Sequence, residues 1–297
     1  MGLRSFTGRL PKLTTGVSVV VPAYNEAESV GRVVRGLKAP GWPWLKEVLV
    51  VSDGSSDDTA KVAAEAGAEV VEHSENLGYG AALKTGIRAA SGDAVATIDA
   101  DGQHEPADLA TLVQLSGEAD LVIGERQPRI HSPLWRMPGK WLISAVARYV
   151  VRRKIPDLNC GYRVFDRQVM LKYLHICPDG FSFSTTSTVV FLNRKLRVAW
   201  TPIAVKPRTG KSTVSAGTGF EALLLLLRLA SLFEPLRVFL PFSASLGLIG
   251  LGWAIPHALA GRGLSVGALL LITSGVILFS MGMLLDQISA SRKERFE

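Results

Sequence analysis

Cysteine is nearly absent from this chain of 297 residues, in which only Cys160 and Cys177 occur. Two cysteines cannot form a disulfide framework, and these two lack the Cys-x-x-Cys spacing of a structural zinc site. The sequence therefore excludes a disulfide-stapled domain and fits a reducing compartment. Residues 1–15 contain basic residues but no long apolar core, so we expect a short N-terminal tail there and not a signal peptide.

Acidic residues are missing from residues 126–156, which contain eight Lys or Arg and several aromatic residues. The whole chain has a formal net charge of +7, which indicates an anionic partner. A solvated helix face would account for this segment, and so would a surface that meets lipid headgroups or a phosphorylated acceptor. No RNA- or DNA-binding module is recognisable, so we expect no nucleic-acid partner.

Charged residues are also missing from two long apolar segments, 238–259 and 264–285. Each segment is long enough to cross the ~30 Å hydrocarbon core of a bilayer. Only residues 260–263 separate the segments, which predicts a transmembrane hairpin, with a pair of buried core helices as the alternative. Basic residues follow the second segment and predict that the catalytic domain and the C-terminus are cytoplasmic. We also expect that these spans can mediate homo-oligomerisation.

The sequence predicts five parts along the chain. After the tail of residues 1–15, residues 16–218 are expected to form the catalytic domain, and residues 219–235 a leucine-rich amphipathic helix lying on the membrane. Residues 236–288 contain the two transmembrane helices, and residues 289–297 form a basic cytoplasmic tail.

Short apolar runs at 17–21, 47–51, 69–72, 94–98 and 120–124 predict strands. Helical segments alternate with them, so we expect an α/β fold with right-handed βαβ units and a Rossmann-like, mostly parallel sheet. Ligands bind beyond the C-terminal ends of the strands in such a sheet. Three polar motifs follow the first, second and fourth runs, and we therefore expect these motifs to converge on one edge.

The motif Asp99-Ala100-Asp101 follows the fourth run. Two carboxylates two residues apart in a turn can point at one hard cation, and Mg²⁺ or Mn²⁺ prefers oxygen ligands that it shares with substrate phosphates. Gln103 can supply a further oxygen. His104 could be another ligand, but we expect it to be a surface histidine. A lone Asp-x-Asp is common by chance, but its place after a strand predicts a cation site that neutralises a diphosphate leaving group.

Two further motifs, Pro22-Ala23-Tyr24-Asn25-Glu26 and Asp53-Gly54-Ser55-Ser56-Asp57, join strands to helices. Tyr24 can stack on a base. Glu26 can bond a base edge or simply lie in the first helical turn. Asp53 can accept hydrogen bonds from a base or a ribose, or belong to a helix-capping turn.

Together, these three motifs resemble the nucleotide-sugar motifs of family 2 glycosyltransferases, which have the GT-A fold. Gly124-Glu125-Arg126, Asp157–Arg163 and Arg208–Ser212 are similar to segments of the branch that contains dolichol-phosphate mannosyltransferases and polyprenyl-phosphate glycosyltransferases. The resemblance covers about residues 17–215, and a two-helix C-terminal anchor also occurs in this branch.

The resemblance implies a role for each matching residue. The nucleotide sugar would be held by Pro22, Ala23, Tyr24, Glu26, Asp53 and Asp99. The cation, Mg²⁺ or Mn²⁺, would be held by Asp99, Asp101 and Gln103. The donor diphosphate or the acceptor phosphate would be bound by Arg126, Arg163, Arg208, Lys211 and Ser212. The residues expected to carry catalysis are Asp99, Asp101, Asp157, Arg126 and Arg208.

The chain departs from the family pattern in places. Ser52 occupies the first acidic position of the second motif, and Ser184–Thr186 follow Phe181–Phe183 where relatives often have a Glu. The Gln-x-x-Arg-Trp signature of processive synthases is absent, which favours a non-polymerising enzyme. Gly78-Tyr79-Gly80 lacks the third glycine of a dinucleotide-binding loop, so that interpretation is excluded.

The expected reaction transfers a hexose from GDP-mannose or a UDP-hexose to a polyprenyl or dolichyl phosphate at the membrane, with inversion at the anomeric carbon. A phosphate monoester has a second pKa of about 6, so the acceptor needs positioning and charge screening more than a strong base. One alternative is a membrane-tethered glycosyltransferase with a non-lipid acceptor. Another is a non-catalytic scaffold that binds a sugar nucleotide. A sugar nucleotidyltransferase is disfavoured because its lysine-containing glycine-rich loop is missing.

Overall fold

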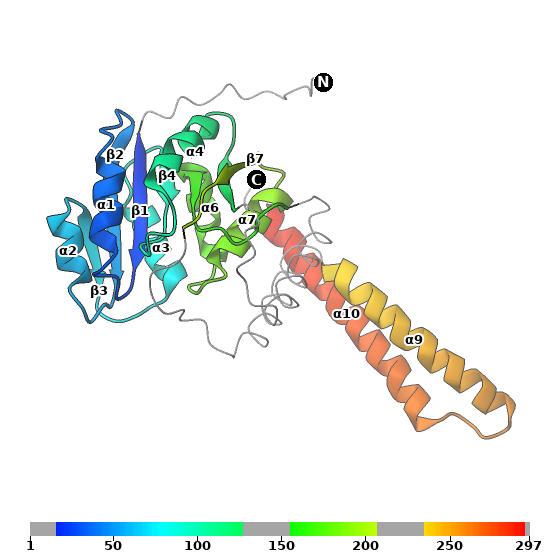
Figure 1. The fold of residues 1–297 in the computed structure, drawn as a ribbon. Coiled ribbons are helices and arrows are strands. Elements are labelled where there is room, and N and C mark those ends of the chain that lie inside the picture. Colours follow the sequence, from blue (N-terminus) through cyan, green and yellow to red (C-terminus); the bar gives the residue numbers. More distant parts are fainter. Residues whose placement is uncertain (1–15, 127–154, 207–234, 295–297) are drawn as a thin grey trace. The chain divides into compact units, whose positions relative to one another are not determined.

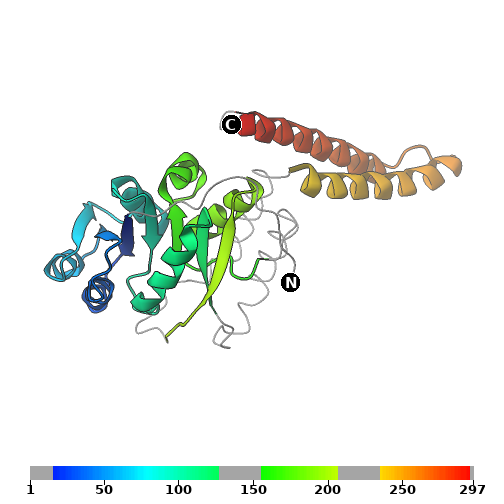
Figure 2. The same ribbon diagram turned by 90° about the horizontal axis from the view of Figure 1, so that it is seen from above.

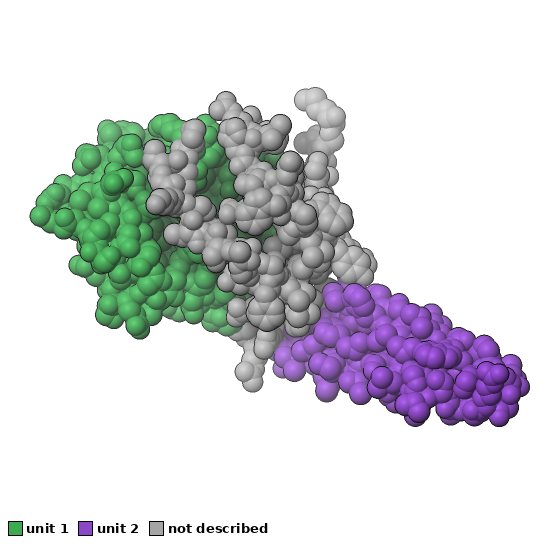
Figure 3. All heavy atoms as spheres, turned by 60° about the horizontal axis from the view of Figure 1, so that its bottom comes forward, with its two compact units in different colours: residues 1–131, 155–213 green, residues 132–154, 214–297 purple. Residues whose placement is uncertain are grey.

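The computed structural model describes residues 16–126, 155–206 and 235–294. The described residues belong to two compact units, which Figure 3 shows in green and purple. One unit is an α/β domain of residues 16–126 and 155–206, and the other is a helical hairpin of residues 235–294 (Figure 1). Most of the predicted basic segment and of the predicted interfacial helix lies outside the described residues.

The described part of the α/β domain contains one seven-stranded sheet in the order β3-β2-β1-β4-β6-β5-β7. Its strands are β1 (Val17–Ala23), β2 (Leu45–Asp53), β3 (Glu69–His73), β4 (Ala94–Thr97), β5 (Leu121–Arg126), β6 (Arg163–Asp166) and β7 (Val198–Ile203). All neighbouring strands pair in parallel except β6, which runs antiparallel to both β4 and β5. The predicted, mostly parallel sheet is confirmed, although the sequence analysis did not anticipate β6 or β7.

Helices cover both faces of this sheet (Figure 2). They are α1 (Val30–Lys38), α2 (Thr59–Glu65), α3 (Tyr79–Ala89), α4 (Leu109–Ser116), α6 (Arg167–Tyr173) and α7 (Phe183–Asn193), with short 3-10 helices η1 (Pro106–Asp108) and η3 (Leu174–Ile176). Because both faces are covered, every residue of β1 is buried, and its sequence is apolar except for Ser18. A Cβ on Gly86 of α3 would come within 2.3 Å of Val20, so the close approach of helix to sheet requires glycine there.

The antiparallel strand β6 brings a distant part of the chain to the predicted ligand edge. Arg163 at the start of β6 is the register partner of Thr97 at the end of β4. The hydroxyl of Thr97 donates a hydrogen bond of 2.6 Å to the carbonyl oxygen of Gly161. Since an antiparallel strand starts where its neighbour ends, the segment before β6 lies at the C-terminal end of β4.

The hairpin unit consists of α9 (Pro235–Leu259) and α10 (Val266–Glu294). Both helices are long and apolar enough to cross a membrane. The first starts three residues before the predicted span, because the fixed φ of Pro235 suits the first helical turn. The second starts at Val266 and continues to Glu294, so the predicted tail of residues 289–297 is helical in its described part.

Small residues allow the two helices of the hairpin to pack closely. A Cβ on Gly250 would lie 2.7 Å from a side-chain carbon of Ile272, and a Cβ on Gly275 would lie 2.9 Å from the carbonyl oxygen of Ser243. A Cβ on Gly252, by contrast, would meet nothing within 4 Å. Glycine is therefore a packing requirement at particular positions of the hairpin and not along its whole length.

We predict that Gly250→Val lowers the thermal stability of the full chain in detergent by about 1–3 kcal/mol, the usual cost of overpacking a tight contact. The matched change Gly252→Val adds the same side chain in open space and should leave the melting midpoint unchanged. Equal midpoints for the two variants would contradict the close packing at Gly250.

Candidate active site

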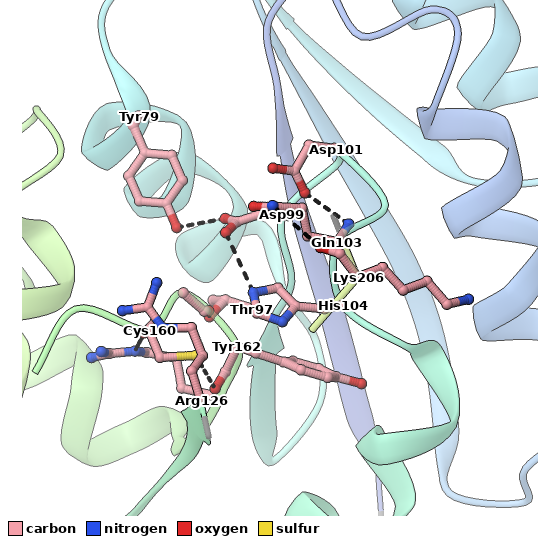
Figure 4. Close-up of polar contacts among 12 residues, drawn as sticks. Tyr79, Thr97, Asp99, Asp101, Gln103, His104, Arg126, Cys160, Tyr162 and Lys206 are labelled. Atoms are coloured by element: carbon pink, nitrogen blue, oxygen red, sulfur yellow. Dashed lines mark hydrogen bonds and ion pairs between the residues drawn. The ribbon is translucent and has the colours of Figure 1, made fainter. Parts of the chain in front are cut away.

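The turn after β4 carries the Asp-x-Asp motif and has a defined backbone conformation. Gly102 has a φ of +71°, a left-handed conformation that favours glycine. The backbone N–H of Gln103 donates a hydrogen bond of 3.0 Å to Oδ1 of Asp101, and this bond closes the turn (Figure 4). The carboxylates of Asp99 and Asp101 therefore lie at the sheet edge, on a turn whose conformation is fixed by its own residues.

Three groups surround the carboxylate of Asp99. The hydroxyl of Tyr79 donates a hydrogen bond of 2.9 Å to Oδ1, and Nε2 of His104 lies 3.8 Å from Oδ2, as Figure 4 shows. On a third side, a Cβ built on Gly161 would lie 2.8 Å from each carboxylate oxygen. Asp99 is therefore enclosed on several sides, yet 31% of its side chain remains exposed to solvent.

His104 is buried, and the expectation of a surface histidine is wrong. Only 6% of the residue is exposed, its ring lies 5.2 Å from that of Tyr162, and its backbone forms an isolated bridge with Val205. Burial lowers the pKa of His104 and outweighs the opposite effect of the nearby Asp99 and Asp101. Its Nδ1 is buried without a hydrogen-bond partner in the part of the chain that the structure describes.

The residues of the turn fit a magnesium or manganese ion better than zinc. Among the described residues, no cluster of three or more His, Cys, Asp or Glu side chains could hold a metal ion by itself. Mg²⁺ and Mn²⁺ do not need such a cluster, because Mg²⁺ retains several waters and uses one or two carboxylates together with substrate phosphates. The carboxylates of Asp99 and Asp101 have the chemistry of such a set of hard oxygen ligands.

The segment after β7 runs beside this turn. The backbone N–H of Lys206 donates 2.8 Å to the carbonyl oxygen of Gln103, the side-chain amide of Gln103 donates 3.4 Å to the carbonyl of Lys206, and Lys206 forms an ion pair with Glu105. The predicted phosphate ligands Arg208, Lys211 and Ser212 follow in sequence but lie outside the described residues.

The first two motifs are joined to each other by hydrogen bonds. The backbone N–H of Asn25 donates 3.1 Å to Oγ of Ser55, and the N–H of Ser56 donates 2.8 Å to Oδ1 of Asn25, which has a positive φ of 54°. Pro22 and Ala23 are buried at the end of β1, whereas Tyr24 is 46% exposed. The aromatic side chain of this motif is thus open to solvent.

The side chain of Glu26 serves the start of α1. It accepts a hydrogen bond of 2.6 Å from the hydroxyl of Ser29, the N-cap residue. Glu26 itself lies before the helix, so the expectation that it lies in the first helical turn is wrong. Asp57 similarly organises the start of α2, because Oδ1 accepts a 3.0 Å bond from the N–H of Thr59 and Oδ2 accepts a 3.1 Å bond from the N–H of Ala27. The predicted capping role of the second motif thus falls on Asp57.

Asp53 holds a loop in place with both of its oxygens. The N–H groups of Leu77 and Gly78 donate to Oδ1 and Oδ2 at 3.0 and 2.8 Å. Oδ1 also lies 2.7 Å from Nδ1 of His73, whose Nε2 lies 2.9 Å from the hydroxyl of Thr85. The carboxylate is only 4% exposed, so its observed partners are protein groups. Sequence reasoning missed His73, because a lone histidine in a strand gives no signal.

Arg126 and Asp157 form a bidentate pair. Nε and one terminal nitrogen of Arg126 donate 2.7 and 3.0 Å bonds to the two oxygens of Asp157. The backbone N–H groups of Asn159 and Cys160 donate to the same carboxylate at 3.0 and 3.2 Å. Burial by itself would raise the pKa of Asp157, but the hydrogen bonds and charge of Arg126 outweigh it and hold the pKa below its ordinary value.

The structure corrects the expectation that Arg163 binds a phosphate. Only 1% of this residue is exposed, and its guanidinium is turned into the protein. It donates to backbone carbonyls of Leu158, Cys160 and Ser184 and to the hydroxyls of Ser187 and Thr188, at 2.7 to 3.4 Å. The signal for this burial was the run of hydroxyl residues in α7, which supplies acceptors for a buried cation.

Family models match two parts of this chain. The model described as glycosyl transferase family 2 matches residues 18–174, and the model described as GtrB C-terminal hairpin matches residues 234–291. The first match covers most of the sheet and the motifs at its edge, and the second covers the hairpin.

Curated relatives include an undecaprenyl-phosphate 4-deoxy-4-formamido-L-arabinose transferase of Pectobacterium carotovorum, which is 29% identical over 192 residues. The alignment covers 61% of this chain and 58% of that transferase, so the chain spans less than two thirds of the relative's length. An uncharacterized protein of Methanocaldococcus jannaschii is 30% identical over 224 residues, which are 71% of this chain and 90% of the relative.

Solved structures of glucosyl-3-phosphoglycerate synthase from Mycobacterium tuberculosis share the fold. The complex with Mn²⁺, UDP and glucosyl-3-phosphoglycerate has a TM-score of 0.61 at 20% identity and covers 77% of this chain and 86% of that one. The complex with Mg²⁺ and UDP has a TM-score of 0.60 at 22% identity, with 73% and 79% covered. At such identities the likeness concerns the fold alone.

We predict that Asp157→Asn destabilises the protein at neutral pH by about 1–2 kcal/mol, the lower range for a hydrogen bond to a charged group, because Arg126 is partly exposed. Since the pKa of Asp157 is lower in the folded protein, its contribution is present above about pH 4 and is lost as the pH falls further. The melting midpoint of the variant should therefore depend less on pH between 5 and 3 than that of the parent protein.

The control is Asp179→Asn, which removes the partner of Lys84 from an ion pair whose carboxylate is 66% exposed. Exposed pairs contribute little, so this variant should melt like the parent. A similar midpoint for Asp157→Asn would show that the Arg126 pair does not stabilise the fold.

Proposed function

Because the chain belongs to glycosyl transferase family 2, we propose that it transfers a sugar from a nucleotide diphosphate donor to a polyprenyl phosphate at a membrane. The observation that carries this proposal is the turn after β4, where Asp99 and Asp101 leave the sheet edge beside the loops of β1 and β2. Support for a lipid acceptor comes from the hairpin of α9 and α10 and from the Pectobacterium relative, which is an undecaprenyl-phosphate transferase by name.

The nucleoside of the donor would lie over the joined loops that follow β1 and β2. Tyr24 offers an exposed aromatic ring for stacking on the base. Pro22 and Ala23 would contribute backbone, while Glu26 and Asp53 would keep these loops in shape through the hydrogen bonds that they make. The two acids would thus act by supporting the loops of the nucleoside site.

Asp99 and Asp101, with Gln103 beside them, would hold Mg²⁺ or Mn²⁺ at the donor diphosphate. When bound, this cation would neutralise the charge that develops on the leaving nucleoside diphosphate. The enclosure of Asp99 by Tyr79, His104 and Gly161 keeps the carboxylate in one orientation, which is how a preorganised site lowers a barrier.

The reaction would break the bond between the anomeric carbon and the diphosphate and form a bond to an oxygen of the acceptor phosphate. The acceptor oxygen is already anionic near neutral pH, so no side chain has to remove a proton. Arg126 lies at the end of β5, and Asp157 orients it by a bidentate contact. We propose that this pair, with Arg208, Lys211 and Ser212 from the segment after Lys206, positions the acceptor phosphate.

The proposal also covers the identity of the sugar donor and the orientation of the protein in the membrane. GDP-mannose and UDP-hexoses are the donors to test first, with inversion at the anomeric carbon. We propose that α9 and α10 span the membrane as a hairpin, with the α/β domain on the cytoplasmic side, since the basic residues after the second span favour that orientation.

We predict that the full chain in detergent, supplied with Mg²⁺ or Mn²⁺, transfers label from a radioactive nucleotide sugar to polyprenyl phosphate. Asp101→Asn should lower this transfer by roughly 10²–10³-fold, the typical effect of removing an electrostatic group from an active site. Asp93→Asn, at the opposite end of β4, makes the same chemical change away from the turn and should retain activity. The measurement is label extracted into the organic phase.

Label that appears only on a water-soluble acceptor would favour a tethered glycosyltransferase with a non-lipid substrate. No transfer from any donor, by a folded protein that binds a nucleotide, would favour a binding role. Full activity of Asp101→Asn would remove Asp101 from the cation site.

A further inference from the structure

Tyr79 connects the first residue of the Asp-x-Asp motif to the interior of the domain. It is the first residue of α3, and its hydroxyl donates a 2.9 Å hydrogen bond to Oδ1 of Asp99. Its ring stacks on that of Phe181, with 5.6 Å between centroids and 16° between planes. One residue thus has its aromatic face on the segment before α7 and its hydroxyl on a proposed cation ligand, the contact that Figure 4 shows.

The backbone on either side of Tyr79 packs tightly against the segment before α7. A Cβ on Gly78, whose φ is +104°, would lie 2.7 Å from the carbonyl oxygen of Asp179, and a Cβ on Gly80 would lie 2.2 Å from that of Pro178. The N–H of Ala81 donates 3.0 Å to the same Asp179 carbonyl. The glycines on either side of Tyr79 therefore permit a backbone contact between the start of α3 and the segment before α7.

Behind Tyr79, Arg163 holds the first turn of α7. Its guanidinium donates a 2.9 Å hydrogen bond to the carbonyl oxygen of Ser184. Phe181, on which the ring of Tyr79 stacks, lies three residues before Ser184. The buried arginine therefore supports the segment against which Tyr79 packs.

Gly161 packs against the contact between Tyr79 and Asp99 from the other side. A Cβ at this position would lie 2.8 Å from both oxygens of Asp99 and 2.8 Å from the hydroxyl of Tyr79. Any larger residue would have to displace the carboxylate, the hydroxyl or both. The backbone of Gly161 is itself fixed by the hydrogen bond from Thr97.

We propose that Tyr79 is a positioning residue: its hydroxyl holds Asp99 in the one orientation that serves the cation and the donor diphosphate. Gly161 provides the space in which this contact forms. The inference rests on the proposed function and adds to it a role for three residues, Tyr79, Gly161 and Arg163, the last of which was expected to bind phosphate directly. Arg163 acts on the site from behind, by holding the start of α7 beside the segment on which Tyr79 packs, without touching a substrate.

The test measures binding of Mn²⁺ to the full chain in detergent by the electron paramagnetic resonance signal of the free ion, with and without UDP or GDP. Tyr79→Phe removes only the hydroxyl, and the dissociation constant for Mn²⁺ should rise about 10–100-fold, as is usual when a group that orients a metal ligand is lost. Transfer activity should fall at low Mn²⁺ and recover at high Mn²⁺, which a general loss of structure would not produce.

Tyr173→Phe is the matched control, because it removes the same atom from a buried tyrosine that packs on Phe191 and Arg194. It should bind Mn²⁺ like the parent protein. Gly161→Ala approaches the contact from the opposite side, and it should weaken Mn²⁺ binding in the same direction while both variants keep the parent's circular dichroism spectrum.

The outcomes separate this inference from the proposed function. Parent-like Mn²⁺ binding by Tyr79→Phe would overturn the positioning role and leave the cation site intact. Loss of activity that high Mn²⁺ does not restore would also overturn it. A parent protein that binds no Mn²⁺, even with nucleotide, would overturn both the positioning role and the proposed cation site.

Discussion

The pairing of β4 with the antiparallel strand β6 is the constraint on which the candidate site depends. In a purely parallel sheet, only segments that follow strands reach the ligand edge, and here these are the segments after every strand of the sheet except β6. Because β6 runs the other way, the segment that precedes it also reaches this edge. The register of Thr97 with Arg163 places Gly161 against Asp99, and it sets Arg163 behind the site. The loop that carries Asp157 arrives by the same route, and this explains why Gly161, 62 positions further along the chain, packs against the carboxylate of Asp99.

Features of the fold and the site that depend on local sequence patterns could be predicted, whereas features that depend on distant residues could not. Apolar runs and the turns after them are local, so the strands β1 to β5 and the edge at which their motifs converge followed from the sequence. Strands β6 and β7 are only four and six residues long, and the side chains of β7 are partly exposed, so neither has a distinct pattern. The absence of charge over some twenty residues is a strong signal, and it located both hairpin helices. Their ends were less certain, since propensity alone decides whether a helix continues past its apolar stretch.

The two side chains whose surroundings differed most from expectation are Arg163 and His104. Charged and titratable residues are mostly exposed in proteins, and a prediction from residue type inherits that tendency. A buried guanidinium needs a hydrogen-bond acceptor for each of its N–H groups. Carbonyl and hydroxyl groups of α7 supply several of these acceptors. In the sequence, the hydroxyl residues of α7 indicate only a polar segment. His104 is buried because the segment after β7 covers the turn that carries it. Such tertiary coverage, made by residues a hundred positions away, leaves no trace in the local sequence.

The distribution of charge at the edge indicates how a diphosphate could be accommodated there. The carboxylate of Asp157 is balanced by Arg126 in a bidentate pair, and Arg163 faces neutral acceptors inside the domain. Asp99 and Asp101 therefore give the described part of the edge a negative character that would repel a diphosphate. A divalent cation reverses this character locally, and the hydrogen bond from Tyr79 partly offsets the charge of Asp99 without competing for the cation as a lysine or arginine would. On this argument a tyrosine is better suited to the position than a basic residue. The attraction for the phosphates would then come from the cation and from the basic residues that follow Lys206 in the sequence.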